Sequence, residues 1–548
     1  MFYKRGEVKL SEKSREIYDK LIDSDSDLNL IKREFDFSFI YDEIKDKYCL
    51  DDGRNSIDGI LALKAIFVQK YCGLRDRQLE RKAKYDIEIK HFLDIDVDDE
   101  AFDFTTIWKF KKMLGDEKVI SIFNHILEQI KSKGIIKSFR RQAIDTIPIL
   151  AAAALPSITC LIYQAIKGVC NSVSAEILQK IFAETELTTE KLNQYSKARP
   201  LFRSENDEKI KAFQNAAKIG FKVLDVVHNE KLNSEEISLL EEILQDNVIK
   251  QDDDDFQHKH TGHTKKSLVD KDATLGHKTK EDIIYGYKAG VSVTPEGIVT
   301  SYKTTPMSYR DDDHLVPLLE MQEKNGTKCD EVDADSAYGF IHNYVDAEAI
   351  KVILHSPLRD FDPEKMSVYD FKYDKEKNEL TCANNVTVKG RNSGALTFEF
   401  HLKTCKACPK AELCPLSPSK RTTLNENHEA ARRAIARQRE DREINKLNRE
   451  KGIKNFTRLV VENLFAFLEK LGIKITPAYS LEMTKVHVGF IVTFSNMLKT
   501  VRKLRKRKEE EKLSVQTQNK SNFQVVRGFF QNSLLVLFSL STHSCRMC

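Results

Sequence analysis

The chain has 548 residues, 41% hydrophobic and 31% charged, a balance that excludes an intrinsically disordered protein and allows about three domains. Its formal net charge of +4 is too small to indicate a nucleic-acid partner by itself. The N-terminus lacks a signal-peptide pattern, and the apolar run Leu534 to Leu540 is far shorter than the ~20 residues of a membrane helix. We therefore expect a cytoplasmic protein whose cysteines are reduced.

The first part of the chain has the pattern of a helical module. Asn55-Ser56 offers an N-cap for a helix that Gly73 then stops. Apolar residues at helical spacing predict a second helix over residues 76–91 and a third over residues 103–134, split near Gly115. Such a module can hold a helix-turn-helix, although the pattern does not single out a recognition helix.

The middle of the chain predicts a mixed α/β structure. Two strand-like runs over residues 283–305 flank Thr294-Pro295-Glu296-Gly297, whose composition is typical of a tight turn. Other strands are predicted over residues 144–147, 329–335 and 349–355, and a helix over residues 315–322. This order is that of a mixed sheet with a parallel element.

These patterns divide the chain into five parts. They are a helical N-terminal domain (1–134), the first part of an α/β core (135–359) with a helical insertion over about 160–250, a cysteine-rich insert (360–420), a basic helical part of the core (421–512) and a tail that matches no preceding pattern (513–548).

Three carboxylates stand out by their positions. Asp145 lies on the first predicted strand, Asp335 ends a later strand, and Glu462 lies between apolar residues on a helix, where we expect it close to the core. Mg²⁺ and Mn²⁺ prefer carboxylate oxygens, and two such ions can assist phosphoryl transfer. Spacing alone does not select this trio, because most of the 84 acidic residues are solvated surface groups.

The sequence around the trio carries more information than the spacing. Five blocks, in this order within about residues 30–500, resemble DDE-type transposases of bacterial insertion sequences: Gly73–Glu80 with Asp103–Thr106, Gln142–Thr146, Tyr285–Lys288, Ala334–Gly339 and Arg458–Phe465. The third resembles the family's "GYK" strand, the fourth its A-D-x-G-Y block and the fifth its glutamate block.

This resemblance implies a fold and an activity. The core would be an RNase H-like mixed sheet with helical and cysteine-rich insertions, preceded by an all-α domain that binds DNA ends. Asp145, Asp335 and Glu462 would be the catalytic ligands of Mg²⁺ or Mn²⁺, and Arg458 would contact DNA. The enzyme would cut and rejoin DNA as a homo-oligomer on the element's inverted-repeat ends and target DNA, in the bacterial cytoplasm at the nucleoid.

The chain departs from the family pattern at three positions. Asn455 stands where the family often has tyrosine, Glu469 (with Lys470 adjacent) where it often has lysine, and Ala337 where glycine is usual. Two alternatives therefore stay open. One is a catalytically decayed or recruited DNA-binding protein, and the other is a related nuclease that does not join strands.

The cysteine-rich insert suggests a second metal. Cys405, Cys408 and Cys414 form a C-x₂-C-x₅-C pattern, and Cys382 lies upstream as a fourth ligand. Four thiolates suit a tetrahedral structural zinc. The alternative is a set of free cysteines in a small reduced domain.

Clustered basic residues predict contacts with DNA phosphates. The predicted DNA-contacting residues lie on a helix before Glu462 and in or next to the family blocks: Arg432, Arg433, Arg437, Arg458, Lys470 and Lys288. A second basic stretch, 499–508, is followed directly by acidic residues. The alternative for either stretch is a solvated helix face.

Overall fold

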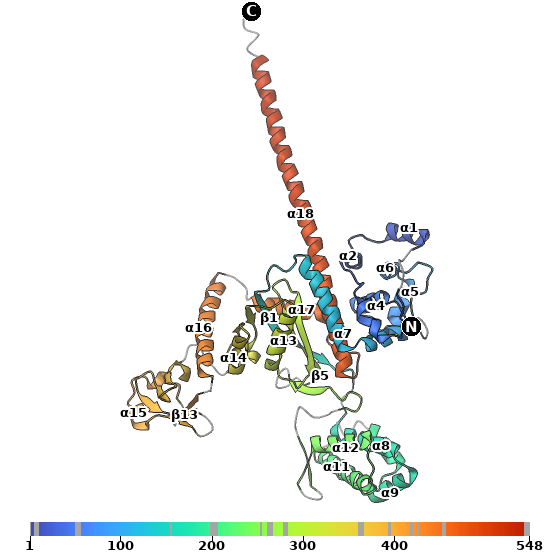
Figure 1. The fold of residues 1–548 in the computed structure, drawn as a ribbon, viewed down its shortest axis with the longest axis vertical. Coiled ribbons are helices and arrows are strands. Elements are labelled where there is room, and N and C mark those ends of the chain that lie inside the picture. The colour runs from blue at the N-terminus through green and yellow to red at the C-terminus, as the bar shows by residue number, and fades with distance from the viewer. Residues whose placement is uncertain are drawn as a thin grey trace, which may run out of the picture.

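The computed structural model describes most of the chain: residues 2–4, 10–49, 56–153, 156–197, 206–251, 255–259, 267–277, 283–359, 366–392, 396–416, 420–424, 427–451 and 456–541. Figure 1 shows the arrangement of its helices and strands. None of the helices in these residues combines the length and apolar character that a membrane crossing requires.

The N-terminal part is helical, as predicted. Its α-helices are α1 (Glu12–Leu21), α2 (Asp27–Glu34), α3 (Ile40–Ile44), α4 (Gly59–Tyr71), α5 (Asp76–Tyr85), α6 (Ile87–Phe92) and α7 (Phe104–Ser132). The predicted break in the third helix is confirmed, because Gly115 has φ 65° and interrupts α7. Gly134, with φ 62°, follows the end of the helix.

Two details of the predicted helices were wrong. The N-cap of α4 is Asp58, whose carboxylate accepts a hydrogen bond from the backbone N–H of Leu61, so Ser56 lies before the helix. The single helix expected over residues 76–91 is two helices, because Asp86 has extended backbone angles and its side chain caps α6 through the N–H of Ile89. A short acidic side chain favours a cap over a helix interior.

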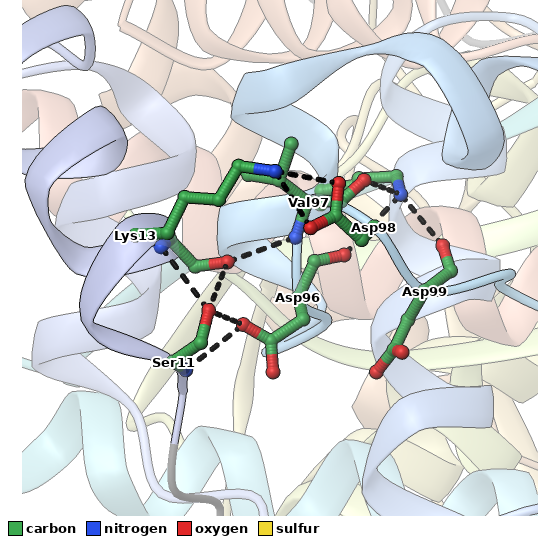
Figure 2. A network of polar contacts seen from close by, with 8 residues as sticks. Ser11, Lys13, Asp96, Val97, Asp98 and Asp99 are labelled. Carbon is green, nitrogen blue, oxygen red and sulfur yellow. Dashed lines mark hydrogen bonds and ion pairs between the residues drawn. The ribbon is translucent and has the colours of Figure 1, made fainter.

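Polar contacts fix α1 to the loop that follows α6 (Figure 2). The Ser11 hydroxyl and backbone N–H both bond the Asp96 carboxylate, at 2.7 and 2.9 Å. Lys13 forms an ion pair with Asp98 at 2.7 Å. The buried Lys90 donates to the backbone carbonyls of residues 96, 97 and 99. These bonds give the loop a defined shape although it has no regular secondary structure.

A mixed sheet forms the centre of the molecule. Its strands are β1 (Arg141–Leu150), β4 (Thr274–His277), β5 (Ile283–Val293), β6 (Val299–Pro306), β7 (Glu331–Asp333) and β8 (Ile353–His355), in the order β4-β5-β1-β7-β8 with β6 also paired to β5. β5 is antiparallel to β1 and to β6, whereas β7 is parallel to β1 and to β8. The predicted hairpin is confirmed, with Gly297 at φ 80° in its turn.

Helices cover both faces of this sheet. On one face α13 (Leu315–Lys324) and α14 (Ile341–Ala349), which connect β6 to β7 and β7 to β8, pack with Ile144 in one core. The other face, with Ile147 and Ile149, packs with α17 (Phe456–Lys470), α18 (Leu481–Ser541) and the N-terminal helices. The strand predicted over residues 349–355 was too long, because α14 continues to Ala349.

Two insertions lie apart from the sheet in Figure 1. The first contains α8 (Ile158–Ser172), α9 (Ala175–Thr185), α10 (Thr189–Lys197), α11 (Asn206–Asn229), α12 (Glu235–Asn247), β2 (Val248–Lys250) and β3 (Phe256–His258), which share a separate hydrophobic core. The second contains the short strands β9 (Lys372–Asp374), β10 (Glu379–Thr381), β11 (Thr387–Lys389), β12 (Arg391–Asn392), β13 (Leu396–Glu399) and β14 (Arg421–Leu424), with α15 (Leu402–Lys406). From there α16 (His428–Glu450) leads back to α14.

Candidate catalytic site

The register of the sheet brings two of the predicted carboxylates together. β1 and β7 are parallel, with Ala143 opposite Asp333. Two residues further along, Asp145 lies on β1, and Asp335 lies two residues beyond the end of β7. The parallel register therefore brings the backbone at Asp335 towards the level of Asp145 on the neighbouring strand. The sequence could predict the two strands but not their pairing.

Asp335 is oriented by the turn that follows β7. It caps the 3₁₀ turn η3 (Ser336–Tyr338), and its Oδ1 accepts a hydrogen bond of 2.8 Å from the backbone N–H of Ala337. The Ser356 hydroxyl donates to its backbone carbonyl at 2.6 Å. Burial raises the pKa of Asp335, as does nearby Asp311, while the Ala337 N–H and Arg359 act in the opposite direction.

Tyr338 lies among the carboxylates. Its side chain is 0% exposed, and its hydroxyl has no hydrogen-bond partner among the described residues. Burial raises its pKa well above the usual value, and Asp145, Asp311, Asp335 and Asp312 raise it further. Burial of a hydroxyl without a hydrogen bond is costly, so the Tyr338 hydroxyl is available as a donor to a group bound beside these carboxylates.

Asp311 is a carboxylate of this site that the sequence analysis missed. Its Oδ1 accepts hydrogen bonds from Lys288 Nζ at 2.7 Å and from Thr146 Oγ1 at 3.1 Å. Thr146 follows Asp145 on β1, so Asp311 is connected to the strand of the first predicted ligand. The only sequence signal was the run Asp311-Asp312-Asp313 after the hairpin, which is equally typical of a polar loop.

Lys288 was predicted to bind DNA, and the structure gives it a different contact. Its side chain is 9% exposed and forms an ion pair with Asp311. It lies on β5 opposite Pro148 of β1. Its ammonium is therefore occupied within the protein.

Glu462 lies on α17, the helix that packs against β1. Beyond this helix, the Leu150 N–H donates to the Lys474 carbonyl at 2.9 Å, and the Thr476 N–H donates to the Leu150 carbonyl at 3.0 Å, which fixes the end of β1. The expectation that Glu462 is close to the core was wrong for its side chain. Val461 and Leu464 are buried, whereas Glu462 is exposed beside them.

A second acidic cluster lies close by. Within the described residues, the donor atoms of Asp312, Asp313 and His342 form the one group of three or more metal-ligating side chains that all lie within 4.8 Å of one another. Asp312 is already held by Arg310 through bonds of 3.0 and 2.6 Å. This arginine occupies both carboxylate oxygens, which makes the cluster a weaker candidate. The 4.8 Å limit suits the ligands of a single ion. Carboxylates that flank two ions about 3.5–4 Å apart can lie further from one another, so the limit does not exclude Asp145 and Asp335 as ligands.

An open cavity of about 340 Å³ adjoins the carboxylates. Lys288, Asp311 and Ala337 line one part of it, and Phe340 and Arg359 another. The Arg359 guanidinium lies 5.0 Å from the centre of the Phe340 ring, and its charge acts to lower the pKa of Asp335. A DNA phosphate next to Asp335 could therefore be neutralised by Arg359, a residue that the sequence analysis did not select.

The four predicted zinc ligands line one small cavity. Cys382, Cys405, Cys408 and Cys414 border a space of about 30 Å³ in the cysteine-rich insert. Burial raises the pKa of the Cys405 thiol, although Lys420 lowers it, and the other three cysteines raise it further. No three of the four sulfurs lie within 4.8 Å of one another, so a tetrahedral site would require small side-chain movements.

The basic residues predicted to bind DNA differ in their surroundings. Arg433 pairs with Glu348 of α14 through bonds of 3.2 and 2.7 Å, and Arg437 donates to the Leu354 carbonyl at 3.3 Å. These two residues therefore attach α16 to the core. Arg432 and Lys470 are exposed. The side chain of Arg458, and all of Asn455, lie outside the described residues.

Comparison with known proteins adds one similarity. Residues 16–113, which run from α1 into α7, match a family described as "Transposase domain (DUF772)". This match supports a transposase, and in general terms a DNA-cutting enzyme. No curated protein and no solved structure matches the chain.

Proposed function

We propose that the chain is a DDE-type transposase with an RNase H-like core, and that Asp145, Asp335 and Glu462 hold Mg²⁺ or Mn²⁺. The sheet supports the fold: the antiparallel strands β6, β5 and β1 continue into parallel β7 and β8 through connecting helices. The family match at residues 16–113 supports the activity independently of the sheet.

The observation that carries the proposal is that Asp145 and Asp335 come together beside the buried Tyr338 hydroxyl, which has no hydrogen-bond partner in the described part of the chain. Two carboxylates, one on β1 and one just beyond the end of the neighbouring β7, are a donor set that Mg²⁺ and Mn²⁺ prefer. The orphaned Tyr338 hydroxyl fits a hydrated ion, because its proton could be donated to a bound water. When bound, divalent ions would activate the attacking water or 3′-hydroxyl and stabilise the leaving oxygen.

The residues of the chain would orient the ligands and the DNA. The N–H of Ala337 fixes one oxygen of Asp335, and the Thr146 N–H bonds Asp145 Oδ1 at 2.7 Å, so each aspartate has a defined direction before substrate binds. Glu462 would complete the set from α17, since its exposed side chain is accessible to DNA. Preorganised ligands reduce the barrier because they need no reorientation during the reaction.

We place DNA contacts on several parts of the molecule. The helical N-terminal domain would bind the inverted-repeat ends, in agreement with its family match. Arg458, Lys470, Arg432 and Arg359 would contact phosphates near the carboxylates. Oligomerisation on paired ends and an action at the bacterial nucleoid belong to the same proposal.

We also propose a structural zinc in the cysteine-rich insert. The support is the common cavity of Cys382, Cys405, Cys408 and Cys414. Metal analysis of the purified full chain should give about one zinc per chain, because four thiolates bind one tetrahedral ion. The Cys405→Ser/Cys408→Ser variant should lose it, while Cys329→Ser, at a buried cysteine outside the insert, should retain it. Equal zinc contents in all three proteins would overturn this assignment.

The experiment that tests the function is cleavage of a DNA duplex that carries the element's own ends. Cleavage and joining that require Mg²⁺ or Mn²⁺ would support the transposase. Cleavage without joining would favour a nuclease. Specific binding without cleavage would favour a decayed or recruited DNA-binding protein, and would direct attention to Asn455 and Glu469.

A further inference from the structure

Asp311 is hydrogen-bonded to two strands of the sheet, one of which carries Asp145. Its Oδ1 bonds both Lys288 of β5 and Thr146 of β1. It is close enough to Asp335 to raise the pKa of that carboxyl group. Three strands or strand ends therefore meet at this one side chain.

The ion pair of Asp311 is partly withdrawn from water. Lys288 is 9% and Asp311 35% exposed at the side chain. A buried ammonium is unfavourable unless a carboxylate compensates it, and an aspartate next to Asp145 and Asp335 is unfavourable unless a cation compensates it. Lys288 and Asp311 satisfy both requirements when only protein groups are present. A divalent ion bound beside Asp311 would provide the positive charge that the Lys288 ammonium otherwise provides.

A second, independent observation indicates that a ligand belongs between these groups. The Tyr338 hydroxyl is fully buried and has no hydrogen-bond partner among the described residues. Asp145 and Asp311 are the two carboxylates with the largest effect on it. A donor that faces several carboxylates but bonds none of them is suited to a hydrated cation that they share.

We propose that Asp311 is a fourth carboxylate of the divalent-metal centre, and that Lys288 is the cation that neutralises it until a metal ion binds. This inference rests on the proposed function, because it assumes that Asp145 and Asp335 bind metal. It assigns Lys288 a role in the metal equilibrium, in place of the DNA contact predicted from the sequence. The chemical class of the ligand is a hard divalent cation such as Mg²⁺ or Mn²⁺.

The proposal predicts opposite effects for the two partners of the ion pair. Asp311→Asn removes a negative charge and an oxygen ligand, so metal binding should weaken. Lys288→Gln removes a competing positive charge, so metal binding should tighten. A purely structural ion pair would behave differently, because loss of either partner would destabilise the fold and leave metal affinity unchanged or lower in both variants.

The test is calorimetric titration of Mn²⁺ into the full-length protein without DNA. We expect Asp311→Asn to raise the Kd about 10–100-fold, the usual effect of losing a supporting group of a metal site. Lys288→Gln should lower the Kd by about 3–10-fold, the size expected for removing one nearby charge. Asp313→Asn is the matched control: it removes an exposed carboxylate two residues away, from the competing acidic cluster, and should leave the Kd unchanged.

The outcomes separate this inference from the proposed function. If the wild type binds no Mn²⁺, or Asp335→Asn binds it equally well, the metal centre itself is wrong. If the wild type binds but Asp311→Asn matches it, or Lys288→Gln weakens binding, only the role of Asp311 is overturned. If Asp311→Asn fails to fold, the Mn²⁺ titration of Lys288→Gln tests the role of Asp311 by itself. Asp311→Glu then serves as a second variant, in which the carboxylate is kept.

Discussion

Core packing explains the ring of Tyr338, which follows Asp335 in the sequence, but not its hydroxyl. Its phenol ring fills the core between α13, α14 and β7, while its hydroxyl, near four aspartates, has no hydrogen-bond partner in the part of the chain that the structure describes. Core packing alone would be satisfied by phenylalanine. The hydroxyl is therefore the part of Tyr338 that requires a functional explanation.

Tyr338→Phe should separate stability from activity. Removing a buried, unpaired hydroxyl should stabilise the metal-free protein by about 1–3 kcal/mol, because the desolvation cost disappears. The same change should lower Mn²⁺-dependent cleavage, because the donor to the bound ion's water is lost. Denaturant unfolding in EDTA measures the first effect and duplex cleavage the second. A destabilised variant with wild-type cleavage would contradict this interpretation.

A buried polar contact joins α4 and α18, two helices that are far apart in the sequence. Lys70 of α4 is buried and its Nζ lies 2.6 Å from Nδ1 of His487 on α18. Burial, and to a smaller extent the charge of Lys111, lower the pKa of Lys70 to about 7, although Asp76 acts in the opposite direction. The contact between α4 and α18 is thus made by a lysine that releases its proton more easily in the folded chain.

This contact predicts a pH dependence of stability. Since the pKa of Lys70 is lower in the folded state, the unfolded chain binds more protons between pH 7 and about 10, and the free energy of unfolding should rise over that window. In Lys70→Met the rise should be smaller. Chemical denaturation at pH 7, 8.5 and 10 measures both slopes. Lys20→Met, at an exposed position on α1, should keep the wild-type slope, and equal slopes for all three proteins would refute the prediction.

The elements that the sequence predicted well are those with local signals. The hairpin β5–β6 has its turn residues, and α7 has its cap and its glycine break. Asp86 was missed because both flanking segments have helical spacing, so only the backbone reveals the division. Asp311 was missed for a different reason: its importance comes from Lys288, Thr146 and Asp335, which are distant in sequence and meet only in the folded sheet.

At the scale of the whole molecule, the N-terminal helices and the sheet share one core. Side chains of α4 and α7 pack with those of β1, β5, α17 and α18. The ring centres of Phe67 and Phe494 lie 4.8 Å apart across this junction. By contrast, the helical insertion α8–α12 has its own core and forms a separate lobe in Figure 1, and α18 projects beyond the other elements.

The shared core predicts that its parts unfold together. Phe494→Ala should cost about 3–5 kcal/mol, because it leaves a cavity where α4 and α18 meet. Hydrogen exchange should then increase in α4 and in β5 alike. Phe221→Ala, within the separate core of the insertion, should increase exchange in α8–α12 and leave β5 protected. Loss of protection in α4 alone after Phe494→Ala would show that the N-terminal helices are an independent unit.

The central claim is that Asp335 belongs to a metal-dependent centre for DNA cleavage and joining. The most direct test compares the wild type, Asp335→Asn and Asp330→Asn on a duplex that carries the element's ends, with Mn²⁺. Asp330 is the matched control, an exposed carboxylate five residues earlier that pairs only with Arg140 among the described residues. We predict cleavage and joined product for the wild type and Asp330→Asn, and at least a 100-fold loss, about 2.7 kcal/mol, for Asp335→Asn with unchanged DNA binding. Undiminished cleavage and joining by Asp335→Asn would contradict the account.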